Sequence, residues 1–101
     1  ELQLINCNYN KLTTLKAGGY TNLKTLYCSN NQLSDLDVTE NGLLETLLCK
    51  NNLLTCLDVS NNARLDYLDC RDNPYLDTIY VAKDQTIADL YKDEHTTIVT
   101  R

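Results

Sequence analysis

Apolar residues recur along the chain at an interval of 21 residues, and each copy reads LxxLxCxxNxLxxLxV. Four columns agree through four copies: Leu2, Leu23, Leu44 and Leu65; Ile5, Leu26, Leu47 and Leu68; Cys7, Cys28, Cys49 and Cys70; and Asn10, Asn31, Asn52 and Asn73. Self-similarity at a period of roughly 20 to 50 residues is typical of a solenoid, in which each unit buries its apolar face against its neighbours. We therefore expect a single solenoid domain.

The second half of the unit is conserved in spacing through three copies and shifted by one residue in the fourth. Because Pro74 supplies the extra residue and proline interrupts strands, we place this insertion in a turn. The repeat pattern covers residues 1–81, with units at residues 2–22, 23–43, 44–64 and 65–86, the last carrying the inserted residue.

Residues 82–101 depart from the pattern, and we expect them to form a C-terminal cap of the kind that repeat proteins need for solubility. Leu90 keeps the apolar spacing, but Lys92 occupies the Cys position of the unit. We predict a short helical turn over residues 86–95, and a closing strand in the β-branched segment 96–100.

Polar and apolar positions alternate around the Cys column, which predicts a short strand with one buried face in every unit. The Asn column falls where the chain leaves this strand, and its amides can bond backbone groups of adjacent coils. Too few residues remain for a crossover helix, so we expect extended or 3₁₀ segments on the convex side. The expected fold has a parallel sheet on the concave side and little α-helix.

The unit resembles the leucine-rich repeat in a short form in which Cys replaces the usual Leu. It is most similar to the cysteine-ladder repeats of bacterial surface proteins, the internalin J-like and Bacteroidetes types, on repeat length, the Cys column and the LDVS phrase at residues 57–60. The resemblance implies an interaction module that is secreted or located at the cell surface.

The cysteine column allows three interpretations: packed thiols, disulfides or a metal site. Stacked parallel strands lie about 4.8 Å apart with parallel Cβ directions, which does not suit a disulfide torsion, and zinc needs ligands around a point. We therefore predict a structural ladder of reduced thiols at Cys7, Cys28, Cys49 and Cys70, beside the Asn ladder of Asn10, Asn31, Asn52 and Asn73. Cys56 falls outside the ladder, near the convex-side turn and partly exposed.

Side chains at the third, fifth, seventh and eighth positions of the unit should point away from the core and form the concave face. On this face we expect Tyr27, Leu48 and Tyr67 to be neighbours, because tyrosine provides rigid area with a polar group at binding centres. Solvated β-formers making ordinary cross-strand contacts are the alternative. The candidate partner-binding residues are Tyr27, Leu48, Tyr67, Lys50, Asp69, Arg71, Tyr9 and Asp72.

Charge and composition exclude several functions. The formal net charge of −5 argues against a nucleic-acid backbone or an anionic membrane as partner, and no apolar run approaches the roughly 20 residues of a membrane span. His95 is the only histidine, and no nucleophile or phosphate-loop motif accompanies it. We expect no enzymatic activity, no cofactor and no metal.

The function that these observations favour is protein binding through the concave face of an extracellular or cell-surface protein. Glycan binding is the alternative, since tyrosine can stack on sugar rings, and a structural spacer is a third interpretation. Four short strands offer far less than the about 800 Å² that a standard interface needs per partner. We therefore expect further repeats of the parent protein on the N-terminal side of Glu1.

Overall fold

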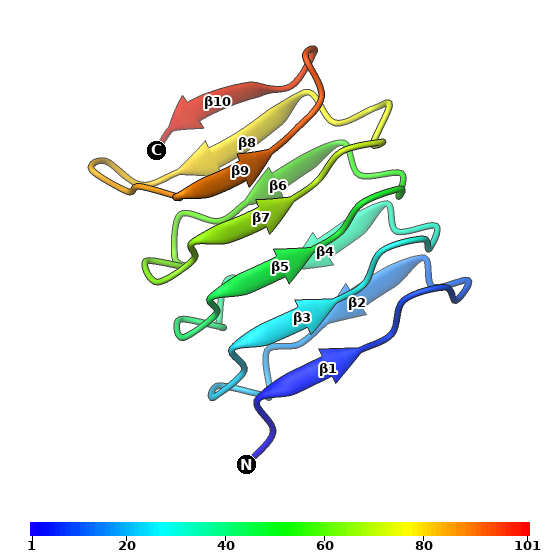
Figure 1. The fold of residues 1–101 in the computed structure, drawn as a ribbon, viewed down its shortest axis with the longest axis vertical. Coiled ribbons are helices and arrows are strands. Elements are labelled where there is room, and N and C mark those ends of the chain that lie inside the picture. The colour runs from blue at the N-terminus through cyan, green and yellow to red at the C-terminus, as the bar shows by residue number, and fades with distance from the viewer.

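Two short strands recur in every coil, one on each side of a narrow core (Figure 1). The structure is a computed structural model that describes residues 1–101, and it contains no helix. One side is a five-stranded parallel sheet, here called sheet A: β1 (Leu4–Asn6), β3 (Thr25–Tyr27), β5 (Thr46–Leu48), β7 (Tyr67–Asp69) and β9 (Asp89–Tyr91). The opposite side carries β2 (Thr14–Lys16), β4 (Asp35–Asp37), β6 (Cys56–Asp58), β8 (Thr78–Val81) and β10 (Thr97–Thr100).

Strand register follows the repeat predicted from the sequence. In sheet A, Ile5 lies opposite Leu26, Leu26 opposite Leu47, and Leu47 opposite Leu68. On the opposite side Leu57 pairs with Ile79, so the residue inserted at Pro74 is absorbed in the turn between the strands. The leucine-rich-repeat solenoid predicted from the 21-residue pattern is confirmed, and its convex side consists of extended strands.

The opposite side is not one continuous sheet. β2 pairs only with β4, while β6, β8 and β10 form a separate three-stranded sheet. Both sheets are parallel, and the ladder is interrupted between β4 and β6. Sheet A is therefore the uninterrupted platform of the molecule.

Residues 86–95 do not form the helical turn that we predicted. Instead β9 adds to the edge of β7, with Leu90 opposite Leu68. The reason is local: Asp89, Leu90 and Tyr91 alternate outward, inward and outward, and the edge of β7 offers backbone groups that a helical turn would leave unpaired. The expected closing strand does occur, as β10, which pairs with β8.

The apolar columns form one continuous core. Nineteen buried residues make up this cluster, including Leu26, Leu47 and Leu68 at zero exposure. Burying a leucine contributes about 1.5–3 kcal/mol, so each coil is stabilised chiefly by stacking on its neighbours. The first coil is less well covered, since Ile5 and Cys7 are only partly buried.

The cysteine column lies in the core as free thiols. Cys28, Cys49 and Cys70 are buried, Cys7 is half-buried, and no cysteine forms a disulfide. The predicted ladder of packed thiols is thus present. Cys56, which we expected to be partly exposed, is exposed at the start of β6.

The Asn ladder ties successive coils together at the turn that follows sheet A. The amide nitrogen of Asn52 donates to the carbonyl of Cys49 in its own coil and to that of Cys28 in the preceding coil, at 3.1 and 3.0 Å. Its oxygen accepts from the backbone N–H of Leu33 at 3.0 Å. Asn31 and Asn73 repeat this arrangement. The ladder fixes where each strand of sheet A ends.

A second amide ladder, formed by Asn41, Asn62 and Gln85, was missed in the sequence. It lies at the other turn, after the strands of the opposite side, and its amide nitrogens donate to backbone carbonyls of the preceding coil. Asn41 and Asn62 are completely buried. The sequence signal is weak, because Tyr20 occupies the matching place in the first coil and the spacing to Gln85 is irregular.

Candidate binding surface on sheet A

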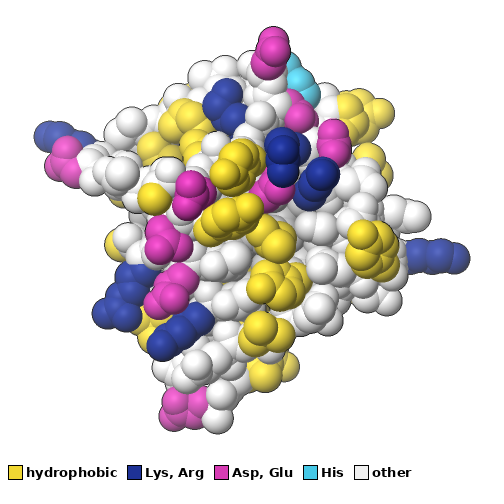
Figure 2. All heavy atoms as spheres, in the orientation of Figure 1, with side chains coloured by type: hydrophobic (Ala, Val, Ile, Leu, Met, Phe, Trp, Pro, Cys, Tyr) yellow, Lys and Arg dark blue, Asp and Glu magenta, His cyan; other side chains and the backbone are white.

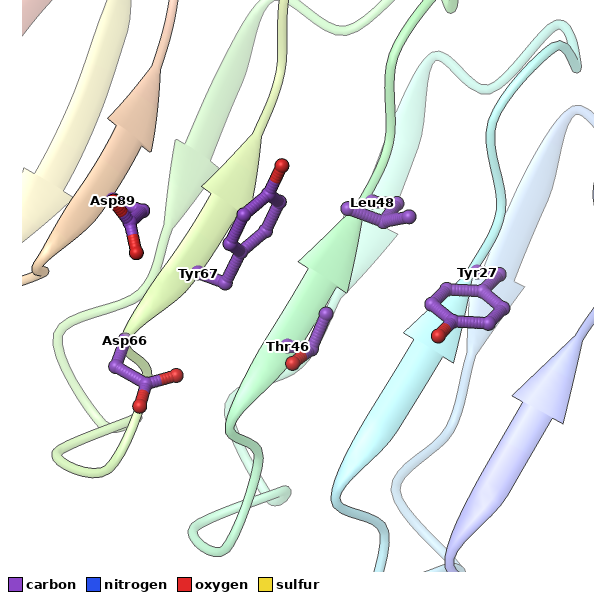
Figure 3. Close-up of a pocket in the computed structure, with 6 residues that line it drawn as sticks. All are labelled: Tyr27, Thr46, Leu48, Asp66, Tyr67 and Asp89. Carbon is purple, nitrogen blue, oxygen red and sulfur yellow. The ribbon is translucent and has the colours of Figure 1, made fainter.

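Outward-facing side chains of sheet A surround a shallow hollow of about 420 Å³ (Figure 3). The strands place them by alternation, since the middle residue of each strand points into the core and its two neighbours point outward. The hollow is lined by Tyr27, Leu48, Tyr67, Thr46, Asp66 and Asp89. The structure therefore brings together the three residues that we expected to be neighbours, Tyr27, Leu48 and Tyr67.

An apolar band continues across the whole sheet. Figure 2 shows it as a yellow stripe over the strands, with acidic side chains, and basic ones beside them, along one side of it. Leu4, Tyr67 and Tyr91 are exposed, at 50%, 37% and 39%, and Tyr27 and Leu48 are half-buried. Exposed apolar patches of this kind, with a polar rim, mark interaction sites on soluble proteins.

Arg71 is held firmly beside this band. Its guanidinium donates to both carboxylate oxygens of Asp69, at 2.9 and 2.8 Å, and lies 5.0 Å from the ring centroid of Tyr91. The rings of Tyr91 and Tyr67 are themselves 5.6 Å apart. The hydrogen bonds from Arg71 hold the pKa of Asp69 below its ordinary value, although burial acts in the opposite direction. Asp69 is 7% exposed, so it positions Arg71 and offers little surface of its own.

Five of the eight predicted partner-binding residues do not line the hollow: Asp69 and Arg71, just described, and Tyr9, Asp72 and Lys50. Tyr9 and Asp72 occupy the turn after their strands, where the backbone adopts positive φ values of 59° and 60°. Lys50 lies next to this turn, with its ammonium 3.9 Å from Asp72. These side chains lie at the edge where the strands of sheet A end.

The structure adds four residues that the sequence analysis did not name. Thr46, Asp66 and Asp89 line the hollow, and Tyr91 extends the aromatic cluster. The repeat pattern could have indicated Thr46 and Asp66, since they occupy outward or edge positions of the same repeat. Asp89 and Tyr91 were missed because residues 86–95 were expected to be a helical turn.

The opposite side carries a smaller, acidic hollow of about 260 Å³ around the interruption between β4 and β6. Asp37 and Asp58 face it, and the hydroxyls of Thr39 and Ser60 donate to them at 2.6 Å. The Thr39 hydroxyl lowers the pKa of Asp37. For Asp58, burial raises the pKa, but the hydrogen bonds from Ser60 and the neighbouring Arg101 guanidinium together outweigh it, so the net shift is downward. These carboxylates are engaged in local turns.

The ladder thiols are poor nucleophiles. Burial raises the pKa of Cys28 and of Cys70 to about 12, and raises that of Cys49 well above its ordinary value. Since the thiolate is the reactive form of cysteine, these side chains are inert near neutral pH. The only histidine, His95, lies in the fifth coil with its Nε2 atom 3.2 Å from the carbonyl oxygen of Asn73.

A family model described as leucine-rich repeats in two copies matches residues 1–41. Residues 1–41 carry leucine-rich repeats. The fold of the chain matches a solved structure described as the functional domain of InlJ from Listeria monocytogenes, which includes a cysteine ladder, with a TM-score of 0.72 and 28% sequence identity. The match covers 96% of this chain and 26% of that one, so this chain spans about a quarter of its length. Among curated proteins, none matches the sequence.

These likenesses agree with the sequence-based resemblance to cysteine-ladder repeats. Solenoids built from leucine-rich repeats are typically non-catalytic and present an extended surface to other proteins. Every regular element of this one is a short strand, so none is a candidate for a membrane-spanning helix.

Proposed function

We propose that the protein is a non-catalytic interaction module that binds a protein partner through the exposed face of sheet A. The observation that carries this proposal is the hollow formed by Tyr27, Leu48 and Tyr67 on a rigid, uninterrupted sheet. Aromatic side chains on a fixed scaffold lose little conformational entropy on binding, which makes them effective binding centres.

A role at the cell surface or outside the cell is part of the same proposal. It is supported by the resemblance of the repeat to those of bacterial surface proteins and by the fold shared with InlJ. The proposal assigns no catalytic step to the chain, in keeping with the inert ladder thiols. Residues 82–101 also cover the last repeat, where the carboxylate of Asp93 accepts hydrogen bonds from the backbone N–H groups of Asp72 and Asn73 at 3.1 Å.

The test is a comparison of two double variants of the same residue type. Tyr27→Ala with Tyr67→Ala removes rings from sheet A, whereas Tyr20→Ala with Tyr75→Ala removes exposed rings elsewhere. Both variants and the unsubstituted protein are screened against arrays of purified cell-surface proteins and of glycans. We expect the sheet A variant to lose at least about tenfold in affinity for a protein partner, and the control variant to bind normally.

Equal binding by both variants would show that sheet A is not the binding face. Binding confined to the glycan array, and lost in the sheet A variant, would replace the protein partner by a carbohydrate. If the unsubstituted protein binds nothing on either array, the result would favour a structural spacer.

A further inference from the structure

Two carboxylates at the hollow of sheet A have no cationic partner. Asp66 and Asp89 are exposed and take part in none of the three salt bridges of the molecule. Asp58, Asp69 and Asp72, in contrast, are each paired with an arginine or a lysine. The hollow therefore combines an apolar floor with two carboxylates that form no salt bridge.

The chain itself shows which cation suits such surroundings. Arg71 bonds both oxygens of Asp69 and stacks over the ring of Tyr91, at 5.0 Å. Arg101 likewise bonds an aspartate, on β6, and lies 4.3 Å from the ring centroid of Tyr80. On both sides of the solenoid, a guanidinium is thus held between a carboxylate and a tyrosine ring. Arginine suits this place because its planar fork can bond a carboxylate while its face stacks on an aromatic ring.

The hollow also offers carboxylates and a tyrosine ring, but no guanidinium lines it. Tyr67 provides the ring, and Asp66 and Asp89 flank it from the preceding residue and from the neighbouring strand (Figure 3). Tyr27 and Leu48 continue the floor on the other side, where the methylene groups of a long side chain can pack. We propose that the hollow binds an arginine side chain that the protein partner presents.

No lysine or arginine of the chain lines the hollow or forms a salt bridge with Asp66 or Asp89. Lys24 lies on the same edge of sheet A, but two coils before Asp66, which is about 10 Å at the usual strand spacing. Lys50 and Arg71 lie at the opposite end of the strands, and each is already paired with an aspartate. The volume of about 420 Å³ is at the small end for a ligand pocket, which suits one anchoring side chain.

This inference rests on the proposed function and adds the chemistry of the partner, so its experiment uses a small probe in place of the partner. The amide resonances of ¹⁵N-labelled protein are followed by NMR during titration with N-acetyl-arginine amide. N-acetyl-citrulline amide is the matched control, because it has the same shape without the charge, and galactose tests for a carbohydrate site.

We expect saturable shifts at Thr46, Asp66, Tyr67 and Asp89 with the arginine probe, and about tenfold weaker binding of the citrulline probe, as loss of charge-assisted hydrogen bonds implies. The double variant Asp66→Asn with Asp89→Asn should bind both probes alike. Asp77→Asn, an exposed aspartate in no salt bridge, should keep the preference for arginine.

Three outcomes overturn the inference: equal binding of both probes, no saturable shift with arginine up to about 50 mM, or shifts at these residues with galactose alone. Each leaves the proposed function intact if the tyrosine variants of sheet A still lose the protein partner. If neither the tyrosine variants nor the aspartate variants lose binding to the protein partner, both proposals are contradicted.

Discussion

The two halves of each coil are built from the same repeat but differ in how completely their polar groups are satisfied. In the half that contains sheet A, five strands pair without interruption, and each buried Asn of its ladder uses both its nitrogen and its oxygen. In the opposite half the strands split between β4 and β6, and the oxygens of Asn41 and Asn62 accept no hydrogen bond from the protein.

This difference indicates where rigidity matters in the solenoid. A buried polar network in which every group is hydrogen-bonded holds the backbone in one geometry, whereas a partly satisfied network stabilises that geometry less. The hollow and the aromatic band lie on the half with the satisfied ladder. A binding surface on that half is presented by strands whose ends are hydrogen-bonded to neighbouring coils through the Asn ladder.

The largest expected effect is on stability, from Asn52→Ala in the Asn ladder. The substitution leaves the buried N–H of Leu33 without an acceptor, because that group bonds only to the Asn52 oxygen. We expect a loss of about 2–4 kcal/mol in the free energy of unfolding, measured by urea denaturation. Asn10→Ala, in the same column but exposed in the first coil, is the control and should cost less than about 1 kcal/mol.

A smaller loss is expected from Asn62→Ala in the second amide ladder. The carbonyls that Asn62 bonds, those of Val38 and Asn41, each keep a backbone donor, so no backbone group is left unpaired. The substitution also removes a buried oxygen that has no partner. We expect a loss of about 1 kcal/mol by the same urea method, and a cost equal to that of Asn52→Ala would contradict the difference between the halves.

The smallest effect is a dependence of stability on pH. Because Arg71 lowers the folded-state pKa of Asp69, the pair stabilises the protein fully above the unfolded aspartate pKa of about 3.9, and this contribution disappears as the pH falls through the folded-state value. Asp69→Asn should therefore cost less than about 1 kcal/mol at pH 7, since Arg71 is exposed, and less still at pH 3.

The matched comparison for this prediction is Asp37→Asn on the opposite side. Its pKa is lowered by Thr39, so the sign of the pH dependence is the same, but the carboxylate is exposed and the effect should be smaller. Urea unfolding of both variants and the parent at pH 7 and pH 3 gives the comparison. A larger pH dependence for Asp37 than for Asp69 would contradict it.

Much of the fold could be predicted because the repeat itself encodes the contacts. In a solenoid every residue of a column contacts the same column in the next coil. The spacing of 21 residues between Leu26 and Leu47 therefore predicts that they lie opposite each other. The grouping of Tyr27, Leu48 and Tyr67 followed from the same register. Where the spacing drifted, as in residues 82–101, the prediction of a helical turn was wrong.

The sequence by itself determined the period, the inward and outward alternation, the thiol and Asn ladders and the three residues at the centre of the candidate surface. Only the tertiary structure decided that the fifth coil joins sheet A, that the opposite side is interrupted, and that Asp66 and Asp89 lie unpaired beside Tyr67. The physical reason is that stacking repeats at a fixed spacing, whereas ion pairs and strand ends depend on how neighbouring coils settle against one another.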